Sequence, residues 1–93
     1  MNPTWYRRPE DSTLEQLGDA YLCYQYSSAE THLLDLFSGE IFLQIGDSPS
    51  TTTELAASMA ALCDEPNSEE WLVRVGKVLR NLQTLELVDK RDV

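Results

Sequence analysis

The first third of the chain contains short apolar segments with the alternation of β-strands. Two of them, Thr13–Leu17 and Ala20–Tyr26, flank the dipeptide Gly18-Asp19. Glycine takes the positive φ that the first central position of a two-residue hairpin requires, so the dipeptide predicts a tight turn. Residues 27–30 then indicate a loop, and Thr31–Leu34 a third strand. The pattern therefore predicts a small antiparallel sheet with this third strand at its edge.

The strand Ala20–Tyr26 is rich in aromatic residues, which suit a pleated and half-buried surface. Its period of two gives two sets of side chains, Leu22, Tyr24 and Tyr26 on one face and Tyr21, Cys23 and Gln25 on the other. The first set is the more apolar. The pattern leaves open which set meets the core.

From Leu36 onward apolar residues recur every three or four positions, which predicts helices. The first helix begins after Asp35 or Ser38 as N-cap, and Gly46 is its expected end. A second helix is predicted from about Thr52 to Leu62. Its apolar stripe consists of Leu55, Met59 and Leu62.

A third helix is predicted to start near Ser68, with two glutamates in its first turn. Gly76 lies inside it and suggests a close packing contact. The pair Leu87-Val88 is a candidate terminal strand or wing, and Asp89–Val93 is expected to be a polar tail. The apolar face of the helix is broad: Trp71, Leu72, Val75, Val78, Leu79, Leu82 and Leu85.

Three helices after a small sheet, with a short turn between the second and third, predict an α+β fold. The arrangement is winged-helix-like, with an N-terminal three-stranded antiparallel sheet packed on three helices. Ninety-three residues correspond to a single domain, 1–93.

The composition is strongly acidic. Seven Lys and Arg residues stand against sixteen Asp and Glu, for a formal net charge of −9. Because nucleic-acid affinity depends largely on basic residues that displace counterions, this balance disfavours nucleic acid as a partner. No run of about 18 apolar residues exists, so no membrane span or membrane partner is expected. The polar start lacks the apolar core of a signal peptide, so a cytoplasmic protein is expected, with Cys23 and Cys63 as reduced thiols.

The chain contains none of the residue patterns that carry catalysis or metal binding. His32 is the sole histidine, so neither a catalytic triad nor a histidine-based metal site is expected. The four glycines are scattered and form no phosphate-binding loop. We therefore expect a protein without catalytic residues, metal ligands or cofactors.

Arg74, Lys77 and Arg80 lie within seven positions of the third predicted helix, with no acidic residue among them. In an acidic chain this concentration favours steering of an acidic ligand toward the helix. The same three residues also suit the solvated face of an amphipathic helix. They are the only support for a winged-helix DNA-binding regulator, in which the third helix would enter a major groove.

The order of these features resembles the PqqD family of peptide chaperones, also called RiPP recognition elements. The residues concerned are the Gly18-Asp19 hairpin, the aromatic strand, Thr31-His32-Leu33-Leu34-Asp35, the helix start Thr51-Thr52-Thr53-Glu54-Leu55, and the closing Leu82-x-x-Leu85-x-Leu87-Val88. Trp5 fits as well, so the resemblance covers about residues 5–88. The segment from Ser27 is most similar to the branch associated with HPr-kinase-related proteins, in which a Ser-Gly-Asp-Thr-His-Leu-Leu stretch recurs. Here Ala29 and Glu30 replace its Gly and Asp.

This resemblance implies a non-catalytic peptide chaperone that binds the leader of a ribosomally made precursor peptide. The leader would add as a strand beside the third strand and be presented to an HPr-kinase-related or other peptide-modifying enzyme. A structural subunit of an HPr-kinase-like complex is a further alternative, and the open edge also permits a homodimer. The implied peptide-binding residues are Thr31, His32, Leu33 and Leu34 of the strand, with Trp71, Arg74, Lys77, Val78 and Asn81 of the third helix.

Overall fold

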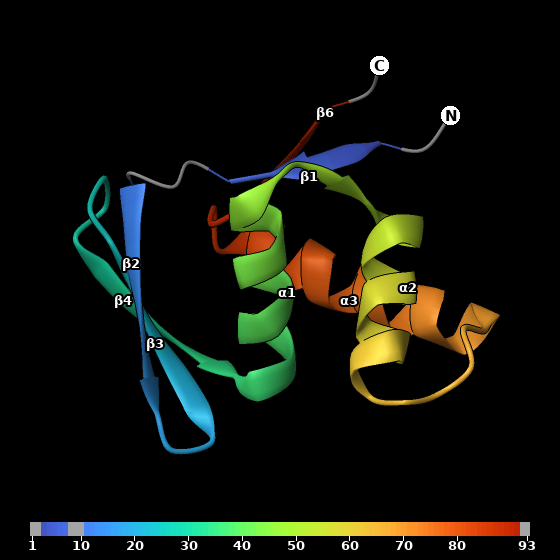
Figure 1. Ribbon diagram of the computed structural model, residues 1–93. Helices are drawn as coiled ribbons and strands as arrows, with labels where there is room; N and C mark the ends of the chain where they lie inside the picture. The colour runs from blue at the N-terminus through green and yellow to red at the C-terminus, as the bar shows by residue number, and fades with distance from the viewer. Residues whose placement is uncertain (1–2, 8–10, 92–93) are drawn as a thin grey trace.

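The computed structural model describes residues 3–7 and 11–91. Over these residues the chain forms three helices and two three-stranded antiparallel sheets (Figure 1). In chain order the elements are β1 (Thr4–Tyr6), β2 (Ser12–Leu17), β3 (Ala20–Gln25), β4 (Glu30–Asp35), α1 (Leu36–Asp47), β5 (Ser50–Thr51), α2 (Thr52–Leu62), α3 (Glu69–Thr84) and β6 (Asp89–Arg91). The predicted α+β fold, with a meander of strands packed on three helices, is confirmed.

The larger sheet has the strand order β2-β3-β4. Its first hairpin pairs Leu17 with Ala20, and Gly18 has a φ of +62°, as the predicted turn requires. The second turn carries Ala29 at a φ of +57°, a left-handed conformation that favours glycine. Ala29 stands where the Ser-Gly-Asp-Thr-His-Leu-Leu stretch described above has its glycine.

The sheet buries the less apolar face of β3. Tyr21, Cys23 and Gln25 are 6%, 0% and 4% exposed, whereas Tyr24 lies on the open face. The two buried polar groups find partners, because Tyr21 donates from its hydroxyl to Glu40 Oε1 at 2.9 Å and the Gln25 amide donates to a backbone carbonyl. Hydrogen bonding thus removes the penalty of burying this face.

The helices begin close to their predicted starts. Asp35 is the N-cap of α1 and accepts from the Ser38 backbone at 2.7 Å, but the helix continues past the expected stop at Gly46. The prediction that Leu62 belongs to the buried stripe of α2 is wrong, since its side chain is 61% exposed. It lies in the last turn, beyond the reach of the core. Leu72 of α3 is also exposed.

The second sheet, of order β5-β1-β6, was not predicted. β1 pairs with both other strands, so the chain between Asp89 and Arg91 is a strand and not the expected polar tail; the last two residues lie outside the described part. Leu87 and Val88, the expected strand, are buried in the core instead. The strand begins after them because these two apolar residues belong to the core cluster.

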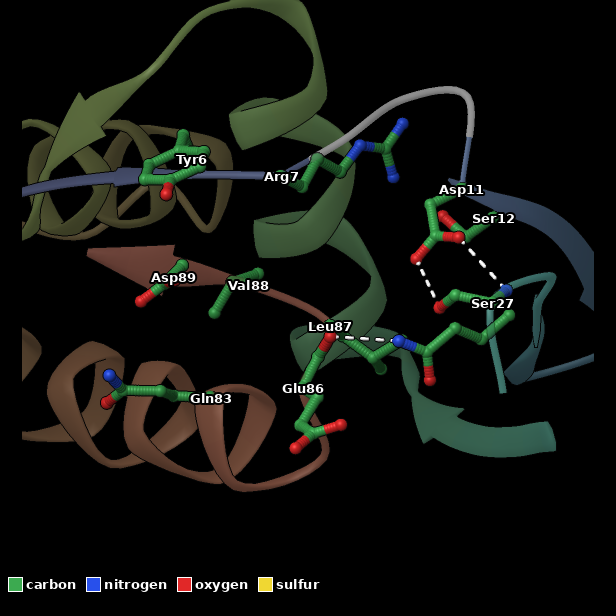
Figure 2. A pocket seen from close by; sticks show the side chains of 11 residues that line it. Tyr6, Arg7, Asp11, Ser12, Ser27, Gln83, Glu86, Leu87, Val88 and Asp89 are labelled. Carbon is green, nitrogen blue, oxygen red and sulfur yellow. Dashed lines mark hydrogen bonds between the residues drawn. The ribbon is translucent and has the colours of Figure 1, made fainter. Parts of the chain in front are cut away.

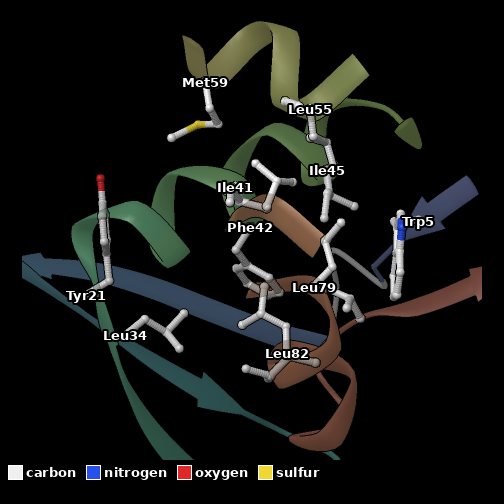
Figure 3. Packing of buried hydrophobic residues seen from close by; sticks show 14 of the residues in the cluster. Trp5, Tyr21, Leu34, Ile41, Phe42, Ile45, Leu55, Met59, Leu79 and Leu82 are labelled. Atoms are coloured by element: carbon white, nitrogen blue, oxygen red, sulfur yellow. The ribbon is translucent and has the colours of Figure 1, made fainter. Parts of the chain in front are cut away.

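The core lies between the larger sheet and the helices. Phe42, Ile41 and Ile45 of α1 are fully buried at its centre, between side chains of α2, α3 and β4 (Figure 3). Trp5 closes it from β1, and its indole donates to Thr52 Oγ1 at 2.9 Å. This packing holds α1 and α3 on the same side of β4.

Candidate functional site

β4 is the terminal strand of its sheet, and within the described residues no strand pairs with its outer side. Backbone hydrogen bonding alternates along antiparallel strands, and the hairpin closes on Leu17 and Ala20. Because Ala20 bonds to Leu17, the alternation directs the backbone groups of Tyr21 and Cys23 toward β4, where they pair with Leu34 and His32. The backbone groups of Thr31 and Leu33 therefore point away from β3. The free edge therefore offers the N–H and C=O groups of these two residues.

The side chains of β4 alternate between the two faces of the sheet. Leu34 lies in the core at 3% exposure, and His32 is half-buried with Nε2 3.3 Å from Gln25 Oε1. Thr31 and Leu33 are exposed on the face away from the helices. The four predicted residues of the strand thus divide into two with inward side chains and two that carry the open edge.

The end of β4 leads directly into an aromatic cluster shared by α1 and α3. Phe37, in the first turn of α1, lies 6.0 Å from the Trp71 ring, measured between centroids. The guanidinium of Arg74 lies over both rings, at 4.8 Å from Phe37 and 4.6 Å from Trp71. Two of the predicted helix residues, Trp71 and Arg74, are therefore held against a residue that follows the end of the strand. Sequence analysis missed Phe37, whose signal was its place two residues after the strand.

Arg74 is exposed, and within the described residues it makes no ion pair with a carboxylate. The rings hold its guanidinium through cation–π contacts, which are worth about 0.5–1 kcal/mol at an exposed site. Lys77 and Asn81 are exposed further along α3, and Val78 is half-buried against the core. The predicted Lys77 and Asn81 therefore lie outside the aromatic cluster.

The C-terminal end of α3 is fixed to the sheet. Glu86 has a φ of +63°, and the backbone N–H of Leu87 donates to the Leu82 carbonyl at 3.0 Å, which are features of a Schellman motif. The Gln25 side-chain amide donates to the Glu86 carbonyl at 2.9 Å. Contacts with Phe37 near its start and with Gln25 after its end therefore set the position of α3 relative to β4.

A cleft of about 410 Å³ lies between the two sheets and the end of α3 (Figure 2). It contains none of the predicted site residues. Asp11 and Gln25 on its wall are occupied by structural hydrogen bonds, Asp11 with the backbone and hydroxyl of Ser27 at 3.0 and 2.9 Å. Asp11 thus closes the end of the β2–β3 hairpin, and Gln25 ties β3 to the turn after α3. The lining residues are Tyr6, Arg7, Asp11, Ser12, Gln25, Ser27, Gln83, Glu86, Leu87, Val88 and Asp89.

Two titratable groups have displaced pKa values, and both belong to the packed interior. Burial raises the pKa of the Cys23 thiol. The hydrogen bond to Glu40 raises the pKa of Tyr21. In the described part of the chain, no group of three His, Cys, Asp or Glu side chains is placed to hold a metal ion. No helix there combines the length and apolarity needed to cross a membrane.

Comparison of the chain with protein-family models, with curated proteins and with solved structures finds no match.

Proposed function

We propose that this protein is a non-catalytic adaptor that binds an extended peptide by strand addition along β4. The observation that carries the proposal is the unpaired outer side of β4, a strand whose end leads into the cluster of Phe37, Trp71 and Arg74. An extended peptide satisfies such an edge with its own main chain, and side-chain pockets beside the edge supply selectivity.

The edge offers two residues, Thr31 and Leu33, whose backbone groups face outward. Every residue in an added strand presents its side chain to one face or the other. One set would lie on the helix side, near the cluster that ends in Arg74. The other set would lie on the open face beside Leu33. The main chain thus supplies affinity, and the cluster selects an apolar or acidic side chain.

The resemblance to the PqqD family identifies the natural ligand we propose, the leader of a ribosomally made precursor peptide. The partner would then be a peptide-modifying enzyme, with an HPr-kinase-related protein as the first candidate. The charge of the site fits an acidic leader, because Arg74, Lys77 and Arg80 form a basic row in a chain of net charge −9.

The test is a titration of the ¹⁵N-labelled protein with synthetic peptides. The probes are the N-terminal 25 residues of each short open reading frame that flanks the gene. We expect one of them to bind with a submillimolar Kd and to shift the amides of Thr31 and Leu33 together with those of α3. Binding of none of these peptides would contradict the leader assignment.

A matched pair of variants at one position separates strand addition from side-chain contact. Leu33→Pro removes an N–H that faces solvent, which an edge strand tolerates, and it blocks main-chain pairing. Leu33→Ala removes the exposed side chain and keeps the backbone. We expect Leu33→Pro to weaken binding at least about tenfold, or about 1.4 kcal/mol, and Leu33→Ala to change it far less. Equal effects of the two variants would refute strand addition.

A further inference from the structure

The face of the larger sheet that points away from the helices is unusually apolar. Cross-strand pairing arranges it in three rows: Leu17, Ala20 and Asp35; Glu15, Leu22 and Leu33; and Thr13, Tyr24 and Thr31. Leu33 is 72% exposed, Leu17 48% and Tyr24 41%. An antiparallel sheet with one solvated face normally has polar residues there. This surface, which we call the outer sheet face, therefore has the character of a contact surface.

The aromatic part of the outer sheet face is held in a fixed arrangement. The rings of Tyr24 and Tyr26 meet edge to face with centroids 5.3 Å apart, and the Tyr26 hydroxyl is hydrogen-bonded to Thr13 Oγ1. Tyr26 is 55% exposed. Ordered, exposed aromatic side chains lose little conformational freedom on binding, which makes them suitable anchors for a protein partner.

The charges around this face have one sign. Glu15 and Asp35 lie in its rows, and Asp19 borders it in the hairpin turn. The sequence has no Lys or Arg between Arg8 and Arg74, while thirteen of the sixteen acidic residues lie in that interval. A partner that covers the apolar rows must therefore meet carboxylates around their rim.

We propose that the outer sheet face docks a protein partner whose contact surface is apolar and rimmed by Lys and Arg. Opposite charges across such a rim favour association, whereas like charges oppose it. If two copies of this chain met through the same face, the carboxylates of one copy would lie against those of the other and repel them. Nucleic acid and anionic lipid would be repelled by the same carboxylates. The face shares the side chains of Thr31 and Leu33 with the β4 edge, but the inference does not depend on peptide binding there.

The test is site-specific photocrosslinking of the full chain in the cells that produce it. The photoreactive residue p-benzoylphenylalanine is placed at Leu17 or at Tyr24, and at Ala57 as a control. Ala57 is exposed on α2, which lies beyond α1 from the sheet (Figure 1). We expect positions 17 and 24 to capture one and the same protein, and position 57 not to. The captured segment should contain apolar residues flanked by Lys or Arg.

The captured protein is then purified and titrated with variants of the intact chain. Glu15→Lys reverses a charge on the outer sheet face, and Glu65→Lys makes the same change in net charge after α2. We expect the first to weaken binding at least about tenfold and the second less than about twofold. Raising the salt from about 50 to 500 mM should also weaken it.

Four results would overturn the proposal: no crosslink at either position, capture of a second copy of this chain, an acidic captured segment, or equal effects of the two charge reversals. β2 lies about 10 Å from β4, two strand spacings away. Leu17→Ser and Glu15→Lys should therefore leave the binding of leader peptides within about twofold. A failure of this proposal is thus distinguishable from a failure of strand addition at β4.

Discussion

Two glycines inside helices should respond in opposite ways to the same substitution. Gly39 lies in α1 and Gly76 in α3. Helix propensity alone predicts that replacing either one by alanine adds about 1 kcal/mol to the stability. The surroundings of the two positions differ, however, and the structure predicts the sign of each change.

At Gly39 a methyl group would overlap the ring of Tyr21, with Cε2 at 2.6 Å and Cγ at 2.7 Å from the added carbon. The ring cannot move aside cheaply, because it is buried and its hydroxyl is bonded to Glu40. Overpacking of this kind costs about 1–3 kcal/mol, and loss of the hydrogen bond costs about 1 kcal/mol more. After the propensity gain we expect Gly39→Ala to destabilise the protein by about 2 kcal/mol.

At Gly76 the nearest atom to an added methyl carbon is the Arg80 guanidinium nitrogen Nη1 at 3.4 Å, the end of a flexible side chain. The close packing expected there from the sequence is therefore absent from the described surroundings, and that expectation is wrong. The propensity gain should be realised in full. Gly76→Ala is expected to stabilise the protein by about 1 kcal/mol.

Thermal unfolding followed by circular dichroism measures both changes. For a domain of this size 1 kcal/mol corresponds to about 4–8 °C, so Gly39→Ala should lower the Tm by about 8–16 °C and Gly76→Ala should raise it by about 4–8 °C. Tyr21→Ala supplies the control, because in that background the clash is gone and Gly39→Ala should become stabilising. A stabilising effect of Gly39→Ala in the wild-type background would refute the packing of Tyr21 on α1.

Four further outcomes follow from local structure. Ala29→Gly should raise the urea midpoint by an amount equivalent to about 1 kcal/mol, because the residue has a φ of +57°; a lower midpoint would contradict that conformation. Thr51→Ala should cost about 1 kcal/mol, measured by thermal unfolding, because it removes the capping box of α2; an unchanged Tm would contradict the cap. A thiol reagent should modify the exposed Cys63 and spare Cys23 until urea unfolds the chain, since Cys23 is buried and its pKa is raised; equal rates would contradict this burial. Stability should fall above about pH 10, where the unfolded state ionises Tyr21 before the folded state does, because its hydrogen bond to a carboxylate of α1 raises the pKa; Tyr21→Phe should reduce this loss, and an unchanged alkaline profile would contradict it.

The helices and the first hairpin could be predicted because their signals are local. The helical period of its apolar residues indicated the limits of α2, and Gly18 indicated the turn. The second sheet has no such signal. Its strands are two or three residues long, and β1 pairs with segments about 45 and 85 positions away. Partners so distant in sequence leave no periodic pattern to read.

The candidate site could be predicted only in its parts. The sequence indicated an edge strand and a basic helix, and it could not show that Arg74 stacks on Phe37 as well as Trp71. That contact depends on how α3 crosses the start of α1, which is a property of packing. The backbone direction at Leu33 likewise depends on the register of two hairpins. Whether the edge binds a peptide stays a prediction.

The sequence pattern of β3 leaves open which of its two faces is buried, and this ambiguity is informative about the protein. The alternation of this strand gives an apolar set on each face, and the structure can cover only one of them with its helices. It covers the face whose polar atoms have internal partners, through Tyr21 and Gln25. The face that remains outside carries Leu22 and Tyr24 among carboxylates. A small sheet that is apolar on both faces has to bury both of them. The helices of this protein bury one face, so the ambiguous pattern of β3 supports our proposal that another molecule binds the other face.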